Sequence, residues 1–308
     1  MCIKSIALKQ RELTGCNHII TSEIEHKALL NSCHYLESLG FEVTYIKPMP
    51  DGIINPEDIE AAITDNTCLI SIMYVNNILG TIQPIEQISE LCIKHNILFH
   101  VDMVQALGNI DINLDALCVD AATFSGHKIH GPKIGFVYIN KAVPFDSFVD
   151  GGGQENGKRA GTENLPYILG VAKAVQLATK NIELKQKKIA KMRDYLLEEC
   201  KKIFSESCIE YRVNGSFENR IANNLHICFK DITGETLVYL LGQNYNVNIS
   251  EGSACNTGNL ETDYVLNAIG VPEDYLNGPI RITLNEYNTM KECRRFIKYF
   301  KKELIDCM

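Results

Sequence analysis

The stretch from Thr67 to Asp102, "TCLISIMYVNNILGTIQPIEQISELCIKHNILFHVD", determines the predicted fold class of this chain. It opens with a continuous apolar run (67–75), typical of a parallel strand that is covered on both faces. The following segment (84–96) has the apolar spacing of an amphipathic helix, and a second short apolar strand (97–102) comes after it. A strand, a helix and a strand in this order predict a βαβ unit of a parallel sheet.

The alternation of strands and helices extends toward the N-terminus. Strands are predicted at 18–22 and 42–46, and helices at 26–40 and 55–63. The helix at 55–63 has Asn55 as its cap and Pro56 at its first position. We therefore predict an α/β fold, with an open and mainly parallel sheet that has helices on both faces.

The second part of the chain has a different character. Residues 165–204 have helical periodicity nearly throughout, with a predicted break near Asn181. Beyond them lie a strand (224–230), a helix (234–242) and a final helix that opens with a capping box at Thr289–Glu292. We predict a large cofactor-binding domain at 1–181 and a smaller α+β C-terminal domain at 182–308.

The composition excludes several classes of protein. The chain has 308 residues, 45% of them apolar, and a formal net charge of −8, which argues against nucleic acid or an anionic membrane as a partner. No window reaches the roughly 18–20 apolar residues of a membrane span, and the start "MCIKSIALKQRELTG" lacks the core of a secretory signal. We expect a soluble, cytoplasmic protein.

The twelve cysteines are scattered along the chain, and none forms a C-x-x-C pair. The spacing therefore predicts no metal site. Cys68, Cys92 and Cys228 lie within apolar runs and are expected to be small core residues.

Polar residues follow the predicted strands. Because ligands bind outside the carboxyl ends of parallel strands, we expect these residues to converge. Each also has a structural explanation: two asparagines form turns, an aspartate caps a helix, and a lysine can lie in a surface loop between hairpin strands. The residues concerned are Asn76, Asn77, Asp102, Gln105, Ser125, His127 and Lys128.

Together these groups match the needs of pyridoxal phosphate. Its aldehyde requires a lysine for a Schiff base, here Lys128 at the end of the run Ala121–Phe124. Its ring nitrogen requires a carboxylate, which Asp102 supplies, and its phosphate requires donors such as Ser125 and His127.

Six stretches of the chain can be compared with known families: "HIITSEIEHKALL" (18–30), "SIMYVNN…GTIQPI" (71–85), "HVDMVQALG" (100–108), "FSGHKIHGPK" (124–133), "GGGQENGKRAGTEN" (151–164) and "SEGSACNTGNLETDYVL" (250–266). In these stretches the chain resembles the cysteine desulfurases, which are class V aminotransferases and fold-type I pyridoxal-phosphate enzymes. The resemblance implies removal of sulfur from L-cysteine, with L-alanine as product, for iron–sulfur clusters or other thio-cofactors.

The resemblance also implies roles for single residues. Lys128 resembles the Schiff-base lysine and Asp102 the partner of the ring nitrogen. Asn77 and Gln105 resemble the partners of the ring oxygen. His26 resembles the imidazole that stacks on the ring and assists proton transfers.

Further roles concern the phosphate and the substrate. Ser125 and His127 resemble phosphate ligands, and Thr162 resembles a threonine that reaches the phosphate of the opposite subunit, which implies a homodimer. Arg281 resembles the arginine that binds the substrate carboxylate, with Asn77 as a second substrate-binding residue.

Cys255 resembles the cysteine that attacks the substrate sulfur and retains it as a persulfide. Its surroundings resemble those of the long-loop class, which transfers sulfur to an iron–sulfur scaffold or another acceptor protein.

The chain departs from the family pattern at several positions. The resemblance implies that the family's N-terminal portion, with its phosphate-binding turn, lies before Met1, so we expect a truncated form. Ile78, Glu251 and Asn285 also differ from the family pattern. Two alternatives follow: a catalytically impaired desulfurase that acts as a dimerisation or scaffold-binding partner, and a selenocysteine lyase. Cys255 argues against an aminotransferase.

Overall fold

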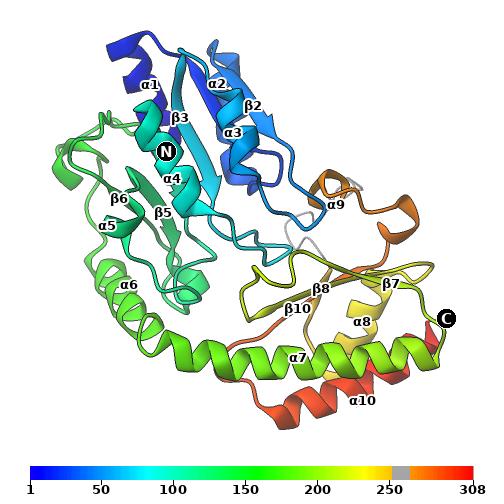
Figure 1. Ribbon diagram of the computed structural model, residues 1–308. Coiled ribbons are helices and arrows are strands. Elements are labelled where there is room, and N and C mark those ends of the chain that lie inside the picture. Colours follow the sequence, from blue (N-terminus) through cyan, green and yellow to red (C-terminus); the bar gives the residue numbers. More distant parts are fainter. Residues whose placement is uncertain (252–263, 308) are drawn as a thin grey trace. The chain divides into compact units, whose positions relative to one another are not determined.

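The computed structural model describes residues 1–251 and 264–307, and the chain divides into two compact units (Figure 1). Unit 1 comprises Met1–Pro48, Ile54–Asn76 and Gln83–Lys180. Unit 2 comprises Met49–Ile53, Asn77–Ile82 and Asn181–Met308. The domain boundary at 181/182 remains a prediction, because a compact unit need not be a domain.

Unit 1 is built on a six-stranded sheet with the order β2-β1-β3-β4-β5-β6. Its neighbouring strands are parallel as far as β5, and β6 is antiparallel to β5. The prediction of a mainly parallel sheet is confirmed. The strands are β1 (His18–Ser22), β2 (Glu42–Ile46), β3 (Thr67–Met73), β4 (Leu98–Asp102), β5 (Ala121–Ser125) and β6 (Gly135–Ile139).

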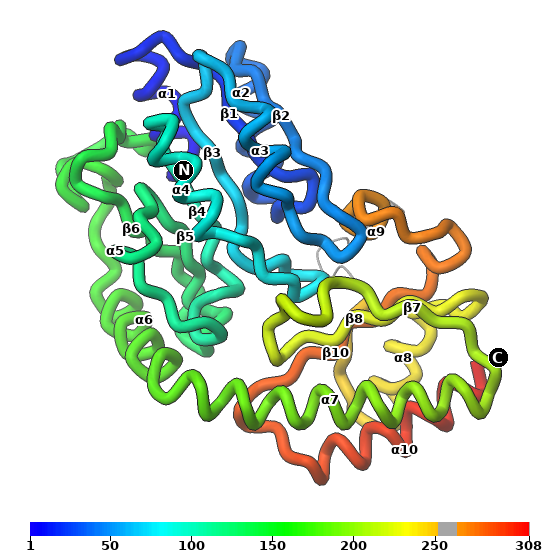
Figure 2. Tube along the Cα trace, viewed as in Figure 1, coloured from blue at the N-terminus to red at the C-terminus, as the bar shows by residue number. Residues whose placement is uncertain are grey.

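Helices cover both faces of this sheet. Helices α1 (Cys2–Thr14) and α2 (Lys27–Ser38) share one buried cluster with Ile19 and Leu69 of the strands. Helices α3 and α4 contact each other and lie in front of the strands in Figure 1; Figure 2 follows the backbone through these elements. The remaining helices of unit 1 are α3 (Pro56–Ala62), α4 (Ile85–His95), α5 (Leu114–Leu117), η1 (Gly126–Ile129), η2 (Glu155–Gly157) and α6 (Leu165–Ala178).

Local signals place the helix ends where the sequence predicts them. The side chain of Asn55 accepts a hydrogen bond from the Glu57 N–H at 3.2 Å, and Pro56 is the first residue of α3. The helical region breaks at Asn181, whose φ of 55° lies in the left-handed region. Both predictions are confirmed.

Buried polar bonds join the ends of neighbouring strands. The carboxyl group of Glu25, which has no exposed surface, accepts hydrogen bonds at Oε1 from Ser22 Oγ (2.7 Å) and from the Met73 N–H (2.9 Å). Asn76 Nδ2 donates to the Ile24 carbonyl at 2.9 Å. These bonds tie the carboxyl end of β1 to that of β3, so Asn76 has a structural role.

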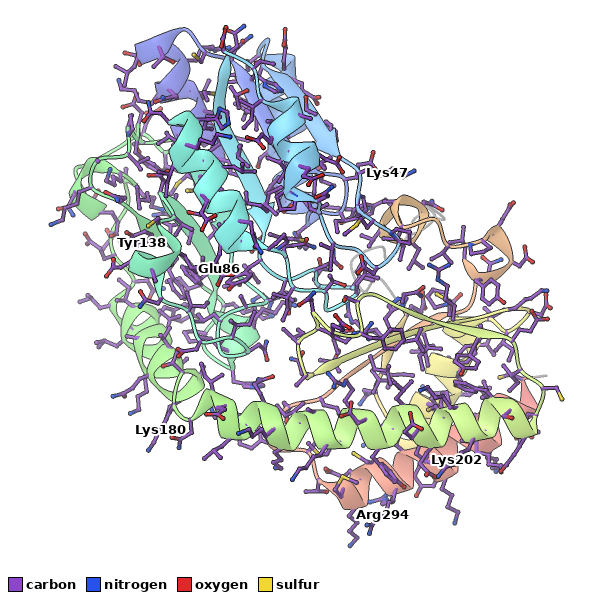
Figure 3. All side chains as sticks on the ribbon, viewed as in Figure 1. Lys47, Glu86, Tyr138, Lys180, Lys202 and Arg294 are labelled. Carbon is purple, nitrogen blue, oxygen red and sulfur yellow. The ribbon has the colours of Figure 1, made fainter. Side chains whose placement is uncertain are left out.

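Unit 2 is an antiparallel sheet with the order β7-β8-β10-β9, packed against helices. The rings of Phe204, Phe229 and Phe300 are fully buried in its core, while Lys202 and Arg294 point outward (Figure 3). The predicted smaller α+β part is confirmed. Its elements are α7 (Ile182–Glu206), β7 (Tyr211–Asn214), β8 (Asn224–Phe229), α8 (Gly234–Tyr245), β9 (Ser250–Glu251), α9 (Tyr264–Ala268), η3 (Glu273–Tyr275), β10 (Pro279–Thr283) and α10 (Met290–Asp306).

The predicted capping box at the start of α10 is also confirmed. Thr289 Oγ1 accepts from the Glu292 N–H at 3.3 Å, and Glu292 Oε2 accepts from the Thr289 N–H at 2.7 Å. These two bonds satisfy donors that a helix N-terminus otherwise leaves unpaired.

Two expectations from composition can be compared with the structure. Cys68, Cys92 and Cys228 are buried, as expected of core residues. None of the helices in the described ranges has the length and apolar content needed to cross a membrane.

Glu25 makes the stability of the fold depend on pH. Burial, and then the nearby charge of Asp102, raise the pKa of this carboxyl from 4.5 to about 8, although the bonds from Ser22 and Met73 oppose the shift. Between pH 4.5 and 8 the unfolded chain has therefore lost a proton that the folded chain keeps. The stabilisation is complete below pH 4.5 and is lost as the pH rises through about 8.

We predict that Glu25→Gln flattens this dependence, because glutamine keeps the acceptor oxygen and cannot ionise. The wild-type free energy of unfolding should fall by up to about 1.4 kcal/mol per pH unit more steeply than that of the variant. Urea unfolding at pH 5, 6, 7 and 8 measures the difference. Glu90→Gln, at an exposed position of α4, is the control and should leave the slope unchanged. Equal slopes in Glu25→Gln and wild type would contradict the prediction.

Candidate active site

His26 comes after β1 and Asp102 ends β4, two strands of the unit 1 sheet that β3 separates. Asp102 is the last residue of β4, and its Oδ1 accepts a hydrogen bond from the Val104 N–H at 2.9 Å. Burial raises the pKa of Asp102, whereas the bond from Val104 and the charge of His26 act in the opposite direction. A cation beside this carboxylate would therefore be strongly favoured.

His26 is the N-cap of α2. Its Nδ1 accepts from the Ala28 N–H at 3.1 Å, so the proton of the neutral ring is on Nε2. The ring is half-buried, and its orientation is set by the helix that it caps. His26 thus presents an oriented Nε2–H group close enough to Asp102 to affect its pKa.

Ser125, His127 and Lys128 lie together at the end of β5 and on η1. Ser125 Oγ and His127 Nδ1 share a hydrogen bond of 2.7 Å. The pKa of His127 is lowered by partial burial and then by the charges of Lys128 and Lys133. Two ammonium groups, an imidazole and a hydroxyl in one short segment suit an anionic group such as a phosphate.

Gly126 lets the chain turn at this point. A Cβ on Gly126 would lie 2.6 Å from the Pro132 carbonyl oxygen, closer than the backbone tolerates. Its N–H donates to the Ile134 carbonyl at 2.8 Å. The glycine therefore holds the His127–Lys128 turn closed against the strand that follows.

Lys128 is exposed rather than buried. Because β5 and β6 are antiparallel neighbours, Lys128 lies in the connection between two hairpin strands. This agrees with the surface-loop explanation that the sequence offered for the lysine. The same position also places its amine at the carboxyl end of β5, next to the end of β4, where a parallel sheet binds ligands.

Gln105 and Thr162 are less constrained. Gln105 is half-buried in the turn after β4, and its backbone carbonyl accepts from Asn109 Nδ2 at 2.9 Å. Thr162 is exposed in the segment that leads into α6. Cys255 lies outside the described residues.

Asn77 and Arg281 belong to unit 2, where the structure brings them together. Arg281 Nη1 donates to the Asn77 backbone carbonyl at 2.9 Å, although 204 positions separate the two residues. The segment around Asn77 is held by Asn224 Nδ2, which donates to the Ile78 carbonyl at 3.0 Å. Gly80, with a φ of +74°, allows this approach, because a Cβ there would lie 2.7 Å from Asn224 Cβ.

The sequence interpretation missed two groups in unit 1. Glu25 is a buried carboxyl that interacts with Asp102. The spacing of Ser22 and Glu25, three positions apart at the end of a strand, was the sequence feature that could have indicated their hydrogen bond. Lys133 adds a charge beside His127 and was visible in "GPK".

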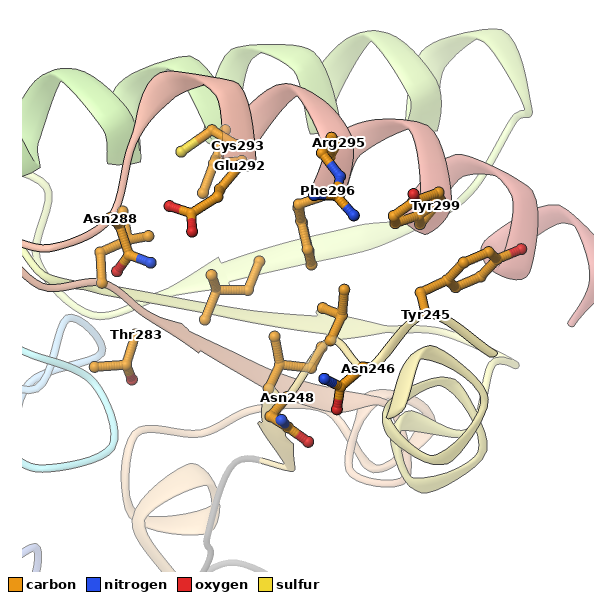
Figure 4. Close-up of a pocket in the computed structure, with 15 residues that line it drawn as sticks. Tyr245, Asn246, Asn248, Thr283, Asn288, Glu292, Cys293, Arg295, Phe296 and Tyr299 are labelled. Carbon is orange, nitrogen blue, oxygen red and sulfur yellow. The ribbon is translucent and has the colours of Figure 1, made fainter. Parts of the chain in front are cut away.

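Two hollows lie away from these residues. One, of about 390 Å³, opens in unit 2 beside α10, and Tyr245 and Tyr299 stack at its rim (Figure 4). The other, of about 470 Å³, lies beside Phe124 and Phe136 in unit 1. Of the predicted site residues that the structure describes, none lines either hollow.

The residues at the strand ends fit pyridoxal phosphate. The raised pKa of Asp102 marks a carboxylate that a protonated ring nitrogen would stabilise. The Ser125–Lys128 segment offers donors and positive charge for the phosphate and an exposed amine for the aldehyde.

Comparisons with known proteins agree with this chemistry. The family model "Aminotransferase class-V" matches residues 3–296. "Cysteine desulfurase IscS" of Methanosarcina thermophila is 43% identical over 96% of this chain and 72% of that protein. "Cysteine desulfurase" of Nostoc sp. is 42% identical over 91% of this chain and 69% of that protein.

Solved structures give the same result. A "NifS-like protein" has a TM-score of 0.89 at 36% identity and is matched over 99% of this chain and 80% of its own. A structure described as "SspA in complex with cysteine" has a TM-score of 0.76 at 36% identity, over 92% of this chain and 78% of its own. This chain therefore belongs to the class V aminotransferase family and, within it, to the pyridoxal-phosphate-dependent cysteine desulfurases.

Proposed function

We propose that this chain binds pyridoxal phosphate and uses it to remove sulfur from L-cysteine. L-Alanine is released, and the sulfur remains as a persulfide on Cys255. One observation carries the proposal: Asp102 and the Ser125–Lys128 segment lie at the carboxyl ends of two adjacent parallel strands, β4 and β5. This is where an open α/β sheet binds its ligand.

Each strand-end residue has a role in holding the cofactor. Lys128 binds it through its amine, Asp102 pairs with the ring nitrogen, and Ser125 and His127 bind the phosphate. When bound, pyridoxal phosphate supplies an electron-withdrawing ring that stabilises negative charge on the substrate's α-carbon. Asn77 and Gln105 are assigned to the ring oxygen.

His26 is assigned to proton transfer. The bond from the Ala28 N–H keeps Nδ1 as an acceptor, so Nε2 is the atom that gives and takes the proton. Because α2 fixes the ring, its position is held without the help of a ligand.

Arg281 is assigned to the substrate carboxylate, with Asn77 beside it. A guanidinium can bind a carboxylate through two parallel hydrogen bonds. The bond from Nη1 to the Asn77 carbonyl orients the guanidinium before substrate arrives.

Cys255 is assigned to sulfur transfer. Its thiolate attacks the substrate sulfur, the carbon–sulfur bond breaks, and a sulfur–sulfur bond forms as L-alanine takes up a proton. The persulfide then passes to an iron–sulfur scaffold or another acceptor protein. A selenocysteine lyase would use the same residues, and comparing L-cysteine with L-selenocysteine as substrates separates the two activities.

A homodimer follows from the assignment of Thr162 to the phosphate of the opposite subunit. The surface next to Thr162 supports it, because the start of α6 exposes large apolar side chains. Leu165 is 64% exposed and Leu169 is 70% exposed. Contact with a second copy would remove this apolar surface from water.

Lys128→Ala should abolish stable binding of the cofactor, because no other residue is assigned to its aldehyde. The test is the visible absorbance that remains after dialysis of the chain with pyridoxal phosphate. Borohydride reduction followed by peptide mass spectrometry should place the cofactor on Lys128. Lys141→Ala, at an exposed position just beyond β6, is the control and should keep the absorbance. A folded wild-type chain that retains no cofactor would contradict the proposal and favour a non-catalytic dimerisation or scaffold-binding partner.

Cys255→Ser should bind the cofactor normally and form no persulfide. After L-cysteine is added, alkylation and mass spectrometry should locate the extra sulfur on the Cys255 peptide of the wild-type chain. The exposed Cys118 and Cys208 provide controls, since their serine variants should retain the persulfide. Normal persulfide formation by Cys255→Ser would refute the role of this cysteine.

Leu165→Glu/Leu169→Glu should convert the dimer to a monomer, because two carboxylates would be buried at the interface. Light scattering during size-exclusion chromatography measures the mass. Leu184→Glu, at a position of α7 that is 68% exposed, should leave the dimer intact. If the double variant remains a dimer, the contact lies on another surface.

A further inference from the structure

His226 is a buried polar residue without an assigned role. It lies in β8, has no exposed surface, and its Nε2 has no hydrogen-bond partner within the described part of the chain. An imidazole nitrogen left in this state is unfavourable, because water no longer solvates it and no protein group replaces the water.

A chain of hydrogen bonds sets which nitrogen carries the proton. Arg212 Nε donates to Asn214 Oδ1 at 3.0 Å, which turns the amide nitrogen of Asn214 toward His226. Asn214 Nδ2 lies 3.1 Å from His226 Nδ1 and donates to it. The proton of the neutral ring is therefore on Nε2, so the unpartnered group is an N–H donor.

Strand pairing places this donor beside Arg281. His226 and Arg281 are directly opposite in the antiparallel pair of β8 and β10. Three positions beyond Arg281, the Leu284 N–H donates to the carbonyl of Asn223, its opposite residue, so these two form a hydrogen-bonded pair. Hydrogen-bonded pairs recur at every second position along an antiparallel ladder, so His226 and Arg281 form a non-hydrogen-bonded pair. Side chains of such non-bonded pairs lie on the same face and close together.

The surroundings keep His226 neutral. Burial, and then the charges of Arg281 and Arg220, lower the pKa of His226 to about 3. Arg281 and Arg220 thus place positive charge near the ring, and among the described residues no carboxylate contributes to its pKa shift. A ligand that accepts hydrogen bonds and carries negative charge would satisfy this donor.

We propose that His226 Nε2–H donates a hydrogen bond to the substrate carboxylate beside Arg281, so that His226 is a further substrate-binding residue. This inference rests on the proposed function, in which Arg281 binds that carboxylate. Arg281 supplies the charge, and the neutral imidazole supplies a second donor from the adjacent strand. The site thereby recognises an amino acid through its carboxylate with groups from β10 and β8.

The test compares variants of the chain loaded with pyridoxal phosphate. His226→Leu should raise the KM for L-cysteine about tenfold and change kcat less than about twofold, as expected when ground-state binding is lost. His226→Gln, which keeps an N–H donor of similar reach, should recover most of the wild-type KM. Ile227→Val changes a buried side chain on the opposite face of β8 and should leave the KM unchanged. An unchanged KM in a folded His226→Leu variant would overturn the inference.

A spectroscopic titration separates this inference from the proposed function. In the nitrogen spectrum at pH 7, His226 should be a neutral ring with its proton on Nε2. Addition of L-alanine, which has the carboxylate but no sulfur to transfer, should shift that Nε2–H resonance. Absence of desulfurase activity in wild type would refute the proposed function, and the titration would still decide on His226. A resonance that does not move at saturating L-alanine would overturn the inference.

Discussion

Parallel strand pairing in unit 1 is the constraint on which the proposed cofactor site depends. Strands β3, β4 and β5 run in the same direction, so their carboxyl ends meet at one edge of the sheet. Asp102 ends β4 and Ser125 ends β5, so strand pairing alone brings these two residues to the same edge of the sheet, without a long loop. A one-residue slip of β5 would reverse the faces of its side chains and separate Ser125 and Lys128 from Asp102.

Buried polar bonds hold both ends of β1. At its carboxyl end Glu25 accepts from Ser22 and Met73, which ties β1 to β3. At its amino end His18 bridges Thr67 of β3 at 2.8 Å and Thr44 of β2 at 2.9 Å, so β1 is tied to both of its neighbours. Such bonds depend on geometry more strongly than apolar contacts do, which favours a single register. Because the acceptor is a buried carboxyl group, its pKa is raised and its contribution to stability depends on pH.

Unit 2 achieves the same convergence by antiparallel pairing and by a long-range contact. β8 and β10 set His226 opposite Arg281, and the segment after Asn76 supplies the Asn77 carbonyl. Asn76 and Asn77 are adjacent in the sequence, yet Asn76 bonds to Ile24 in unit 1 while Asn77 accepts from Arg281 in unit 2. Their shared position after a strand therefore does not imply a shared role.

Local physics explains what the sequence by itself determined. The cap at Asn55, the capping box at Thr289 and the break at Asn181 depend on a few adjacent residues, as do the strands and the Ser125–Lys128 turn. Only the tertiary structure decided the contact of Arg281 with Asn77, the burial of Glu25 and the unpartnered nitrogen of His226. Each of these depends on strand partners and burial, which the spacing of residues along one segment does not encode.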